Sequence, residues 1–385
     1  MQTVIAYVTW AVRLWPWWLR LALASVVLTA IAPAGHRVLP QSPQTVATEQ
    51  PLVCVHTDLI NEVDEWKIQR SLQLVREMGA PTVVEFFPWA YIEPQPGRYN
   101  WHQADRIVRH ARQQGVRIIA RMGFVPQWAR PDDTTFNTIE DDALPDFAAF
   151  VATFAARYAG DIDHLIIWNE PNLAFEWGYQ PPDPARYTRM LQAIYEPVRE
   201  ANPNAIILAA ALAPTLEQPG SPHGLDDRLF LEGMYEAGAA PYFDALALHT
   251  YGFTRPATEE PAPDRLNFRR AELLIDIMRQ YDDPTKPVYI TESGWNDNPR
   301  WVHAVRPSQR VAYTLDAFRW AEQNWDWLDS MCIWILRYPR PTGSYRDNFT
   351  LVTPDFQNKP IYYALQAYAR GWPIEEEPWL PPPVE

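Results

Sequence analysis

Two glutamates stand where apolar runs of the sequence end. Glu170 lies in IIWNEPN (166–172), and Glu292 lies in VYITESGW (288–295). A lone glutamate at the end of a strand is more often solvated or paired with a cation than catalytic. Two carboxyls that face each other across a pocket suit the hydrolysis of an acetal, in which one protonates the leaving oxygen and the other stabilises or attacks the developing cation. This chemistry requires one carboxyl to be neutral and the other ionised.

The elements that would position these glutamates alternate along the chain. Short β-branched runs alternate with longer helical patterns, as is typical of parallel βα units. The eight strand-like runs are 52–56, 82–87, 116–122, 164–169, 205–211, 243–249, 287–292 and 331–336. The helix-like segments lie near 62–79, 101–114, 142–159, 183–201, 226–238, 264–281, 308–324 and 360–370. Eight βα repeats predict one α/β domain, a single (β/α)8 TIM barrel. A doubly wound open sheet is the alternative, but no GxGxxG or GxxxxGK[ST] loop follows a strand.

In such a barrel the chemistry lies at the carboxyl ends of the strands. Strands four and seven face each other across the mouth, so Glu170 and Glu292 are predicted to meet there. The other polar and aromatic residues near strand ends are His56, Glu85, Trp89, Arg121, Asn169, His249, Tyr251 and Trp334. The motifs HExxH, HxH and GxSxG do not occur, and we expect neither a metal nor an organic cofactor.

The two glutamate motifs resemble the signature of clan A glycoside hydrolases, the retaining TIM-barrel glycosidases. The segment PWAYIEPQPGRYNWHQADRIV (88–108), followed by GVRIIARM and VPQWA, is similar to the first half of these enzymes, including their cellulase-like and β-xylosidase-like groups (families 5 and 39). The resemblance covers about residues 52–370. It implies hydrolysis of β-linked glycans with retention, with Glu170 as acid/base and Glu292 as nucleophile.

The resemblance also implies roles for neighbouring residues. Asn169 would grip the sugar 2-hydroxyl. His249 and Tyr251 would lie beside the nucleophile, and Trp334 would be the platform beneath the sugar at the cleavage site.

One position departs from this pattern. Many relatives carry an arginine on strand two that supports the nucleophile, whereas here the strand reads TVVEFFPW (82–89) and offers Glu85. Arg121 on strand three is the candidate replacement, and together with Tyr251 it would hold Glu292 ionised. Glu85 itself either binds a sugar hydroxyl or pairs with Arg121.

Several aromatic residues follow the strands in loops. A tryptophan face can stack on the C–H surface of a sugar ring, and it can equally pack its own loop. The candidates are Trp89, Trp128, Trp177, Trp295 and Trp301. Trp177 and Trp295 are favoured for substrate contact because they lie next to the two glutamate motifs. His56 either contacts a sugar hydroxyl or makes a structural hydrogen bond.

The two cysteines fall on predicted strands one and eight. Cys54 shares phase with His56, and Cys332 shares phase with Trp334, so both side chains should point inward. Alternate strands fill alternate layers of a barrel interior. We therefore expect the two side chains to be offset, and predict two buried thiols rather than a disulfide.

The N-terminal region reads as a targeting segment. Residues 4–34 are apolar apart from Arg13, Arg20 and a few small polar residues, and they predict either a signal peptide or an uncleaved membrane anchor. The chain is then exported, and is either secreted or anchored at the outer face of the cytoplasmic membrane. The predicted organisation is a signal or anchor at 1–34, a linker at 35–50, the barrel at 51–372 and an acidic, proline-rich tail at 373–385.

Composition limits the partners. The 385 residues are 47% hydrophobic and 21% charged, which excludes global disorder. The net charge is −14 and no Lys/Arg-rich cluster occurs, so we expect no nucleic acid held by its phosphates. The expected partner is an oligo- or polysaccharide, with membrane contact only through the N-terminal segment, and the chain is expected to be a monomer.

Two alternatives use the same fold. One is a non-catalytic glycan-binding or envelope-polysaccharide scaffold, although a pure binder has no need of two opposed carboxyls. The other is a transglycosylase that uses the same two glutamates.

Overall fold

The computed structural model describes residues 16–19, 21, 38 and 42–373. The chain divides into two units, residues 1–40 and 41–385. In the first unit, residues 17–19 and 21 are helical and Pro16 is not, and all other residues of the predicted signal or anchor segment lie outside the described residues, as does the tail from residue 374. Among the described residues, no helix is both long and apolar enough to span a membrane.

The second unit contains a closed barrel of eight parallel strands, in the order of the sequence. β1 pairs with β2 on one side and with β8 on the other, which closes the ring. The strands are β1 Val53–His56, β2 Thr82–Pro88, β3 Arg117–Gly123, β4 His164–Ile167, β5 Ile206–Leu212, β6 Ala245–Tyr251, β7 Val288–Gly294 and β8 Leu328–Ile333. The predicted (β/α)8 barrel is confirmed, and the open sheet is excluded.

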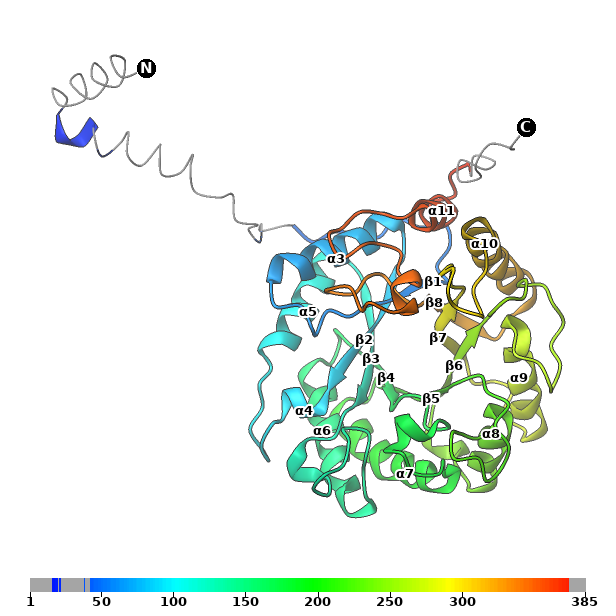
Figure 1. The fold of residues 1–385 in the computed structure, drawn as a ribbon. Helices are drawn as coiled ribbons and strands as arrows, with labels where there is room; N and C mark the ends of the chain where they lie inside the picture. The colour runs from blue at the N-terminus through cyan, green and yellow to red at the C-terminus, as the bar shows by residue number, and fades with distance from the viewer. Residues whose placement is uncertain (1–15, 20, 22–37, 39–41, 374–385) are drawn as a thin grey trace, which may run out of the picture. The chain divides into compact units, whose positions relative to one another are not determined.

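Helices surround the strands (Figure 1). They are α3 Glu65–Met78, α4 Trp89–Ile92, α5 His102–Gln114, α6 Leu144–Arg157, α7 Pro184–Ala201, α8 Asp227–Glu236, α9 Ala271–Gln280, α10 Pro307–Asn324 and α11 Pro360–Ala369. Gly79 ends α3, where it adopts a left-handed conformation with φ of 94°. That conformation is open to glycine at little cost, and it terminates the helix.

The strands are buried on both faces, which explains their continuous apolar runs. On β2, Val84 packs inside the barrel, whereas its neighbours Val83 and Phe87 pack in the layer between strands and helices. Alternate residues of a strand point to opposite faces. Phase along each strand therefore decides which side chains reach the mouth of the barrel.

The pairing of β7 with its two neighbours, β6 and β8, is irregular near the mouth of the barrel. The register between β6 and β7 shifts between Leu248 and His249, after which His249 pairs with Glu292. The register between β7 and β8 shifts between Ile290 and Ser293. A bulge re-aims side chains locally and is common beside active sites. Both shifts bracket Glu292.

Cys54 and Cys332 form a disulfide, and the prediction of two offset thiols is wrong. The two residues are direct register partners of β1 and β8, with Cα atoms 4.0 Å apart. Layers in a barrel are offset along its axis, but register partners lie side by side along the hydrogen-bond direction of the tilted strands. Two inward-pointing partners are therefore neighbours even though alternate strands fill alternate layers.

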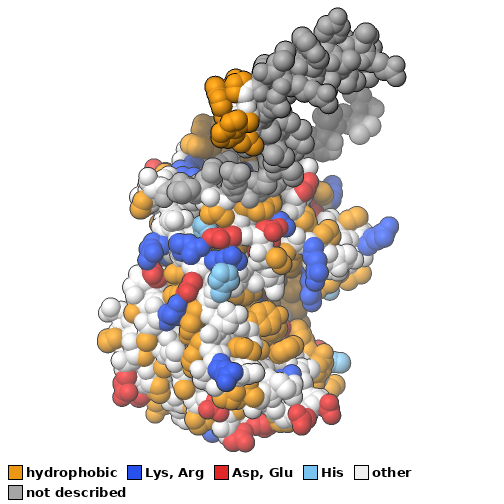
Figure 2. Space-filling model, turned by 90° about the vertical axis from the view of Figure 1, so that its left-hand side faces the viewer, with side chains coloured by type: hydrophobic (Ala, Val, Ile, Leu, Met, Phe, Trp, Pro, Cys, Tyr) orange, Lys and Arg blue, Asp and Glu red, His pale blue; other side chains and the backbone are white. Residues whose placement is uncertain are grey.

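Charges of both signs are interspersed on the surface. Figure 2 shows one face on which Lys/Arg and Asp/Glu side chains lie next to each other. Surface pairs such as Arg157 with Asp105, at 2.7 Å, are of this kind. That face therefore presents no single-sign field that would steer a polyanion.

Candidate active site

Glu170 is held at the barrel mouth by a strained turn. β4 ends at Ile167, and Trp168 and Glu170 then adopt positive φ angles of 78° and 43°. The Glu170 amide donates a hydrogen bond to the Ala211 carbonyl on β5, at 3.0 Å. Such conformations cost a non-glycine residue about 1–3 kcal/mol and cluster at functional sites. The turn fixes the direction in which Glu170 leaves the strand.

Glu292, on β7, accepts a hydrogen bond on each carboxylate oxygen. Arg121 Nη1, from β3, donates to Oε1 at 3.1 Å, and Tyr251 Oη, from β6, donates to Oε2 at 2.8 Å. Arg121 Nη1 also donates to Asn169 Oδ1 at 2.8 Å. Arg121 thus lies beside Glu292 in the supporting place that the resemblance gave to an arginine on strand two.

His249 lies between the two carboxyls. Its Nδ1 is 2.7 Å from Glu170 Oε1 and 3.6 Å from Glu292 Oε2. One nitrogen or oxygen from each of these three side chains lies within 4.8 Å of the others. An oxygen of Glu170 and an oxygen of Glu292 are therefore no farther apart than that, and the two carboxyls share one site.

The surroundings of the two carboxyls differ. Burial raises the pKa of Glu170 to about 7, against the opposing charge of Arg121. Burial also raises the pKa of Glu292, but Arg121 and Tyr251 oppose that rise. Burial lowers the pKa of His249 to about 4, so its imidazole is neutral near pH 7. Glu170 can carry a proton near neutral pH, whereas the donors around Glu292 favour its ionised form.

Two adjoining cavities flank this pair. Cavity A, of about 260 Å³, is lined by residues that include His56, Asp58, Asn61, Phe86, Tyr91, Arg121, Asn137, Asn169, Glu176, Trp334 and Tyr338. Cavity B, of about 410 Å³, is lined by residues that include Glu170, Phe175, Tyr251, Phe253, Glu292, Trp301, Tyr345 and Phe349. Five residues line both: Arg121, Asn169, Glu176, Trp334 and Arg346.

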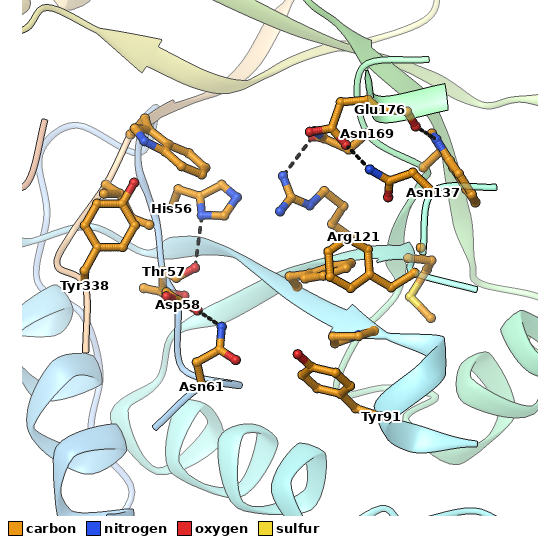
Figure 3. A pocket seen from close by; sticks show the side chains of 18 of the residues that line it. His56, Thr57, Asp58, Asn61, Tyr91, Arg121, Asn137, Asn169, Glu176 and Tyr338 are labelled. Carbon is orange, nitrogen blue, oxygen red and sulfur yellow. Dashed lines mark hydrogen bonds between the residues drawn. The ribbon is translucent and has the colours of Figure 1, made fainter. Parts of the chain in front are cut away.

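The structure brings most of the predicted site residues together around these cavities. His56 and Arg121 point toward each other across cavity A (Figure 3). The His56 ring also packs against Trp334, with centroids 4.4 Å apart. Asn169 and Trp334 stand at the junction of A and B, and Tyr251 lines B. These side chains therefore line the two cavities beside the carboxyl pair.

The prediction that Glu85 meets the substrate or pairs with Arg121 is wrong. Glu85 is fully buried, and its carboxylate accepts hydrogen bonds from Thr57 Oγ1 at 2.6 Å and from the Leu59 and Ile60 amides at 2.9 and 3.0 Å. The residue of β2 that faces the mouth is the next one, Phe86, whose ring lies 4.8 Å from the Arg121 guanidinium carbon. Strand alternation therefore turns Glu85 outward, where it fastens the loop after β1.

Three tryptophans predicted to contact substrate pack the loops instead. Trp89 is fully buried and donates its indole N–H to Glu93, at 2.7 Å. Trp177 is buried against Trp168, with centroids 5.6 Å apart. Trp295 is buried under Gly252, where an added Cβ would come within 1.8 Å of the indole ring.

Sequence reasoning missed several residues of the cavities. Glu176, in the short helix Ala174–Trp177, lines both cavities and accepts a hydrogen bond from Asn137 Nδ2 at 3.1 Å. Burial and the nearby Glu170 raise the pKa of Glu176 to about 7. Arg346 and Tyr338 come from the long loop after β8. None of these follows a strand directly, and a charged residue inside a loop gives no signal by itself.

Glu170, His249 and Glu292 are also the one group of three potential metal ligands found among the described residues. Arg121 and Tyr251 already donate to the two oxygens of Glu292, and the Arg121 charge would repel a cation there. The donor set fits a proton-donating carboxyl beside an ionised carboxylate better than it fits metal ligation.

The family follows from the sequence match. The sequence model of the family described as Cellulase (glycosyl hydrolase family 5) matches residues 55–334. The chain belongs to glycosyl hydrolase family 5. The match contains both glutamates of the site. No curated protein matches this member of the family.

Solved structures show that this family 5 member shares its fold with families 5 and 39. A family 39 glycoside hydrolase from Bacteroides cellulosilyticus WH2 aligns with a TM-score of 0.66 at 20% identity, over 86% of this chain and 65% of that one. A GH39 β-xylosidase from Caulobacter crescentus gives 0.58 at 17% identity, over 84% and 72%. A GH5_18 protein from Bifidobacterium longum subsp. infantis gives 0.61 at 16% identity, over 84% and 79%. This chain thus spans less than two thirds of the length of the first of these relatives.

Proposed function

We propose that this chain is a retaining glycoside hydrolase that cleaves β-linked glycans by double displacement. The observation that carries the proposal is the pair Glu170 and Glu292, with oxygens within 4.8 Å of each other and with different partners. Retaining glycosidases hold their carboxyls about 5–5.5 Å apart, whereas inverting enzymes need about 6.5–9.5 Å to admit a water molecule. The short separation supports retention.

The first step forms an ester with the enzyme. A Glu292 oxygen attacks the anomeric carbon while the bond to the leaving oxygen breaks, and Glu170 gives its proton to that oxygen. Arg121 and Tyr251 hold Glu292 ionised and aimed. Burial keeps Glu170 protonated near neutral pH.

The second step releases the sugar. Glu170, now a carboxylate, takes a proton from water, and the resulting hydroxide oxygen displaces Glu292 from the anomeric carbon. His249 stays neutral and keeps a hydrogen bond to Glu170 in either protonation state. The Asn169 amide lies at the junction of the cavities, where it can hold the sugar 2-hydroxyl.

We also propose that the chain is exported, by the N-terminal run of apolar residues that ends near Ala34. The disulfide between Cys54 and Cys332 supports an oxidising compartment.

The test is hydrolysis of a panel of chromogenic β-glucosides, β-xylosides, β-mannosides and β-galactosides. We expect release of the chromophore from at least one, and a loss of several orders of magnitude in Glu292→Ala. Glu200→Ala, an exposed position on α7, is the matched control and should keep the wild-type rate. Equal turnover by Glu292→Ala and wild type would refute the assignment of the nucleophile.

A further inference from the structure

Cavity A continues away from the carboxyl pair into a further cavity. A third cavity, C, of about 580 Å³, is lined by residues that include Glu62, Val63, Lys67 and Arg340. Asp58, Asn61 and Tyr338 line both A and C. Asn61 is exposed and Val63 is 86% exposed, so this end of the cleft opens to solvent. Cavities B, A and C thus follow one another across the mouth of the barrel.

The residues that line cavity A include buried polar atoms for which the described part of the chain supplies no hydrogen-bond partner. His56 Nδ1 lies 3.0 Å from the Thr57 carbonyl, to which it must donate, and burial holds the pKa of His56 well below its usual value. The ring is therefore neutral, and Nε2 is an acceptor without a hydrogen-bond partner among the described residues. Its neighbour Glu292 Oε1, at 3.7 Å, is an acceptor too. Arg121 Nε also has no partner. A hydroxylated ring in cavity A would satisfy both atoms, because each hydroxyl both donates and accepts.

The residues around the carboxyls set the direction of the substrate. Glu170 and Glu292 both line cavity B, and neither lines cavity A. Asn169 and Trp334, which the sequence resemblance assigns to the attacked sugar, line both cavities, so the leaving sugar that Glu170 protonates lies on the cavity B side of them. The sugar attacked by Glu292 then lies at the junction marked by Asn169 and Trp334, and the sugars that precede it extend through A toward C.

Cavity B has an aromatic wall suited to a sugar ring. Trp301 and Tyr345 are stacked, with centroids 4.6 Å apart and planes 10° apart. Phe349 contacts Trp301 edge-on, and all three line the cavity. Flat aromatic faces bind the C–H surfaces of sugars. The leaving group is therefore expected to be a sugar rather than a small alcohol.

We propose that the chain cleaves bonds inside β-linked glycan chains, and that Asp58, Asn61 and Tyr338 carry the preceding sugars from cavity A into cavity C. An enzyme that removes single terminal sugars needs a wall behind the first one, and here the cleft continues past these three residues. The inference rests on the proposed function and adds the mode of attack. The structural neighbours of this chain leave this open, because they include both an exo-β-1,4-mannosidase and an endo-β-1,4-glucanase.

The test uses β-1,4-linked hexaoses of glucose, mannose and xylose, each labelled with ¹⁸O at the reducing end, and mass spectrometry of the first products. We expect disaccharides to tetrasaccharides from both ends of at least one hexaose before any monosaccharide. Asn61→Trp would narrow the passage between A and C. We expect it to lower kcat/KM on that hexaose, relative to kcat/KM on the aryl glycoside of the same sugar, by about tenfold or more, the loss of one sugar contact.

The matched control is Asn204→Trp, an exposed position before β5 at the opposite end of the barrel, which should leave that ratio unchanged. Initial release of only the non-reducing terminal sugar, or turnover of aryl glycosides with no cleavage of any hexaose, would overturn the internal mode of attack and leave the proposed function standing. So would an unchanged ratio in Asn61→Trp. A chain inactive on every glycoside and every hexaose would contradict the proposed function instead.

Discussion

Replacing Arg121 with methionine removes a positive side chain that contacts both Glu292 and Asn169. Arg121 Nη1 donates to Glu292 Oε1 at 3.1 Å and to Asn169 Oδ1 at 2.8 Å. Both charged side chains are largely screened from water, with 13% of Arg121 and 8% of Glu292 exposed. Methionine fills similar space beside Phe86 without a charge or a donor.

The size of the effect follows from these contacts. A hydrogen bond that involves a charged group contributes about 1.5–3 kcal/mol, and both bonds of Arg121 are of this kind because the guanidinium is charged. A loss of about 3–6 kcal/mol for the two bonds lowers kcat/KM by about 100- to 10,000-fold, since each 1.36 kcal/mol is tenfold. Arg121 also lowers the pKa of Glu292 and of Glu170, so its removal raises both. The nucleophile must be ionised and the acid protonated, so both limbs of the pH profile should move to higher pH.

The assay is kcat/KM against pH on the best chromogenic glycoside. Arg121→Lys keeps the charge and should lose less activity than Arg121→Met. Arg117→Met, on the same strand but exposed at its other end, is the control and should behave as wild type. A methionine variant that keeps more than a tenth of the activity, with an unmoved acidic limb, would refute the role given to Arg121.

Three further predictions concern single contacts. Glu170→Gln should abolish the alkaline limb near pH 7 that the raised pKa of Glu170 predicts, and should slow glycosides with poor leaving groups far more than activated aryl glycosides; an unchanged alkaline limb would contradict this. Tyr251→Phe removes the 2.8 Å bond to Glu292 and should lower kcat/KM by about tenfold, whereas a wild-type value would show that Arg121 suffices. The double variant Cys54→Ala with Cys332→Ala should lower the free energy of unfolding by about 2–5 kcal/mol in chemical denaturation; an unchanged midpoint under non-reducing conditions would count against the disulfide.

The parts of the structure that repeat locally were predictable from the sequence. Alternation of β-branched runs and helical patterns is a local property, and it predicted eight strands in the order that the barrel shows. The motifs around Glu170 and Glu292 pointed to one mouth, where the two carboxyls do meet. The carboxyl ends of all strands in a closed parallel barrel meet at one mouth, so the motifs and the topology together were sufficient to predict that the two glutamates meet.

Predictions were wrong where the position of a side chain depends on the phase of its strand, or on the register between segments that are distant in sequence. Glu85 and Phe86 are adjacent on β2, so an error of one residue in the phase of the strand moves a side chain from the barrel mouth to the layer between strands and helices. The partnership of Cys54 and Cys332 depends on register across the closure between β1 and β8. That register is set by the whole ring of strands rather than by either segment.

Local sequence patterns did not predict which loop residues reach the cavities: some residues were wrongly expected there, and others were missed. Trp295 looked like a substrate contact, yet it packs against Gly252 beneath a loop. Glu176 and Arg346 carried no motif, yet both line the two cavities. The conformation of a loop depends on the packing of the elements below it, which a pattern of residue types does not encode.

Covalent trapping tests the central claim most directly. A 2-deoxy-2-fluoro aryl glycoside of the preferred sugar should acylate the enzyme in the first step and hydrolyse slowly in the second, so that peptide mass spectrometry finds one sugar on the peptide that contains Glu292. The account predicts that label at Glu292 and its disappearance on reactivation. A label on another residue, or an active enzyme that forms no glycosyl ester and releases the inverted anomer, would contradict it.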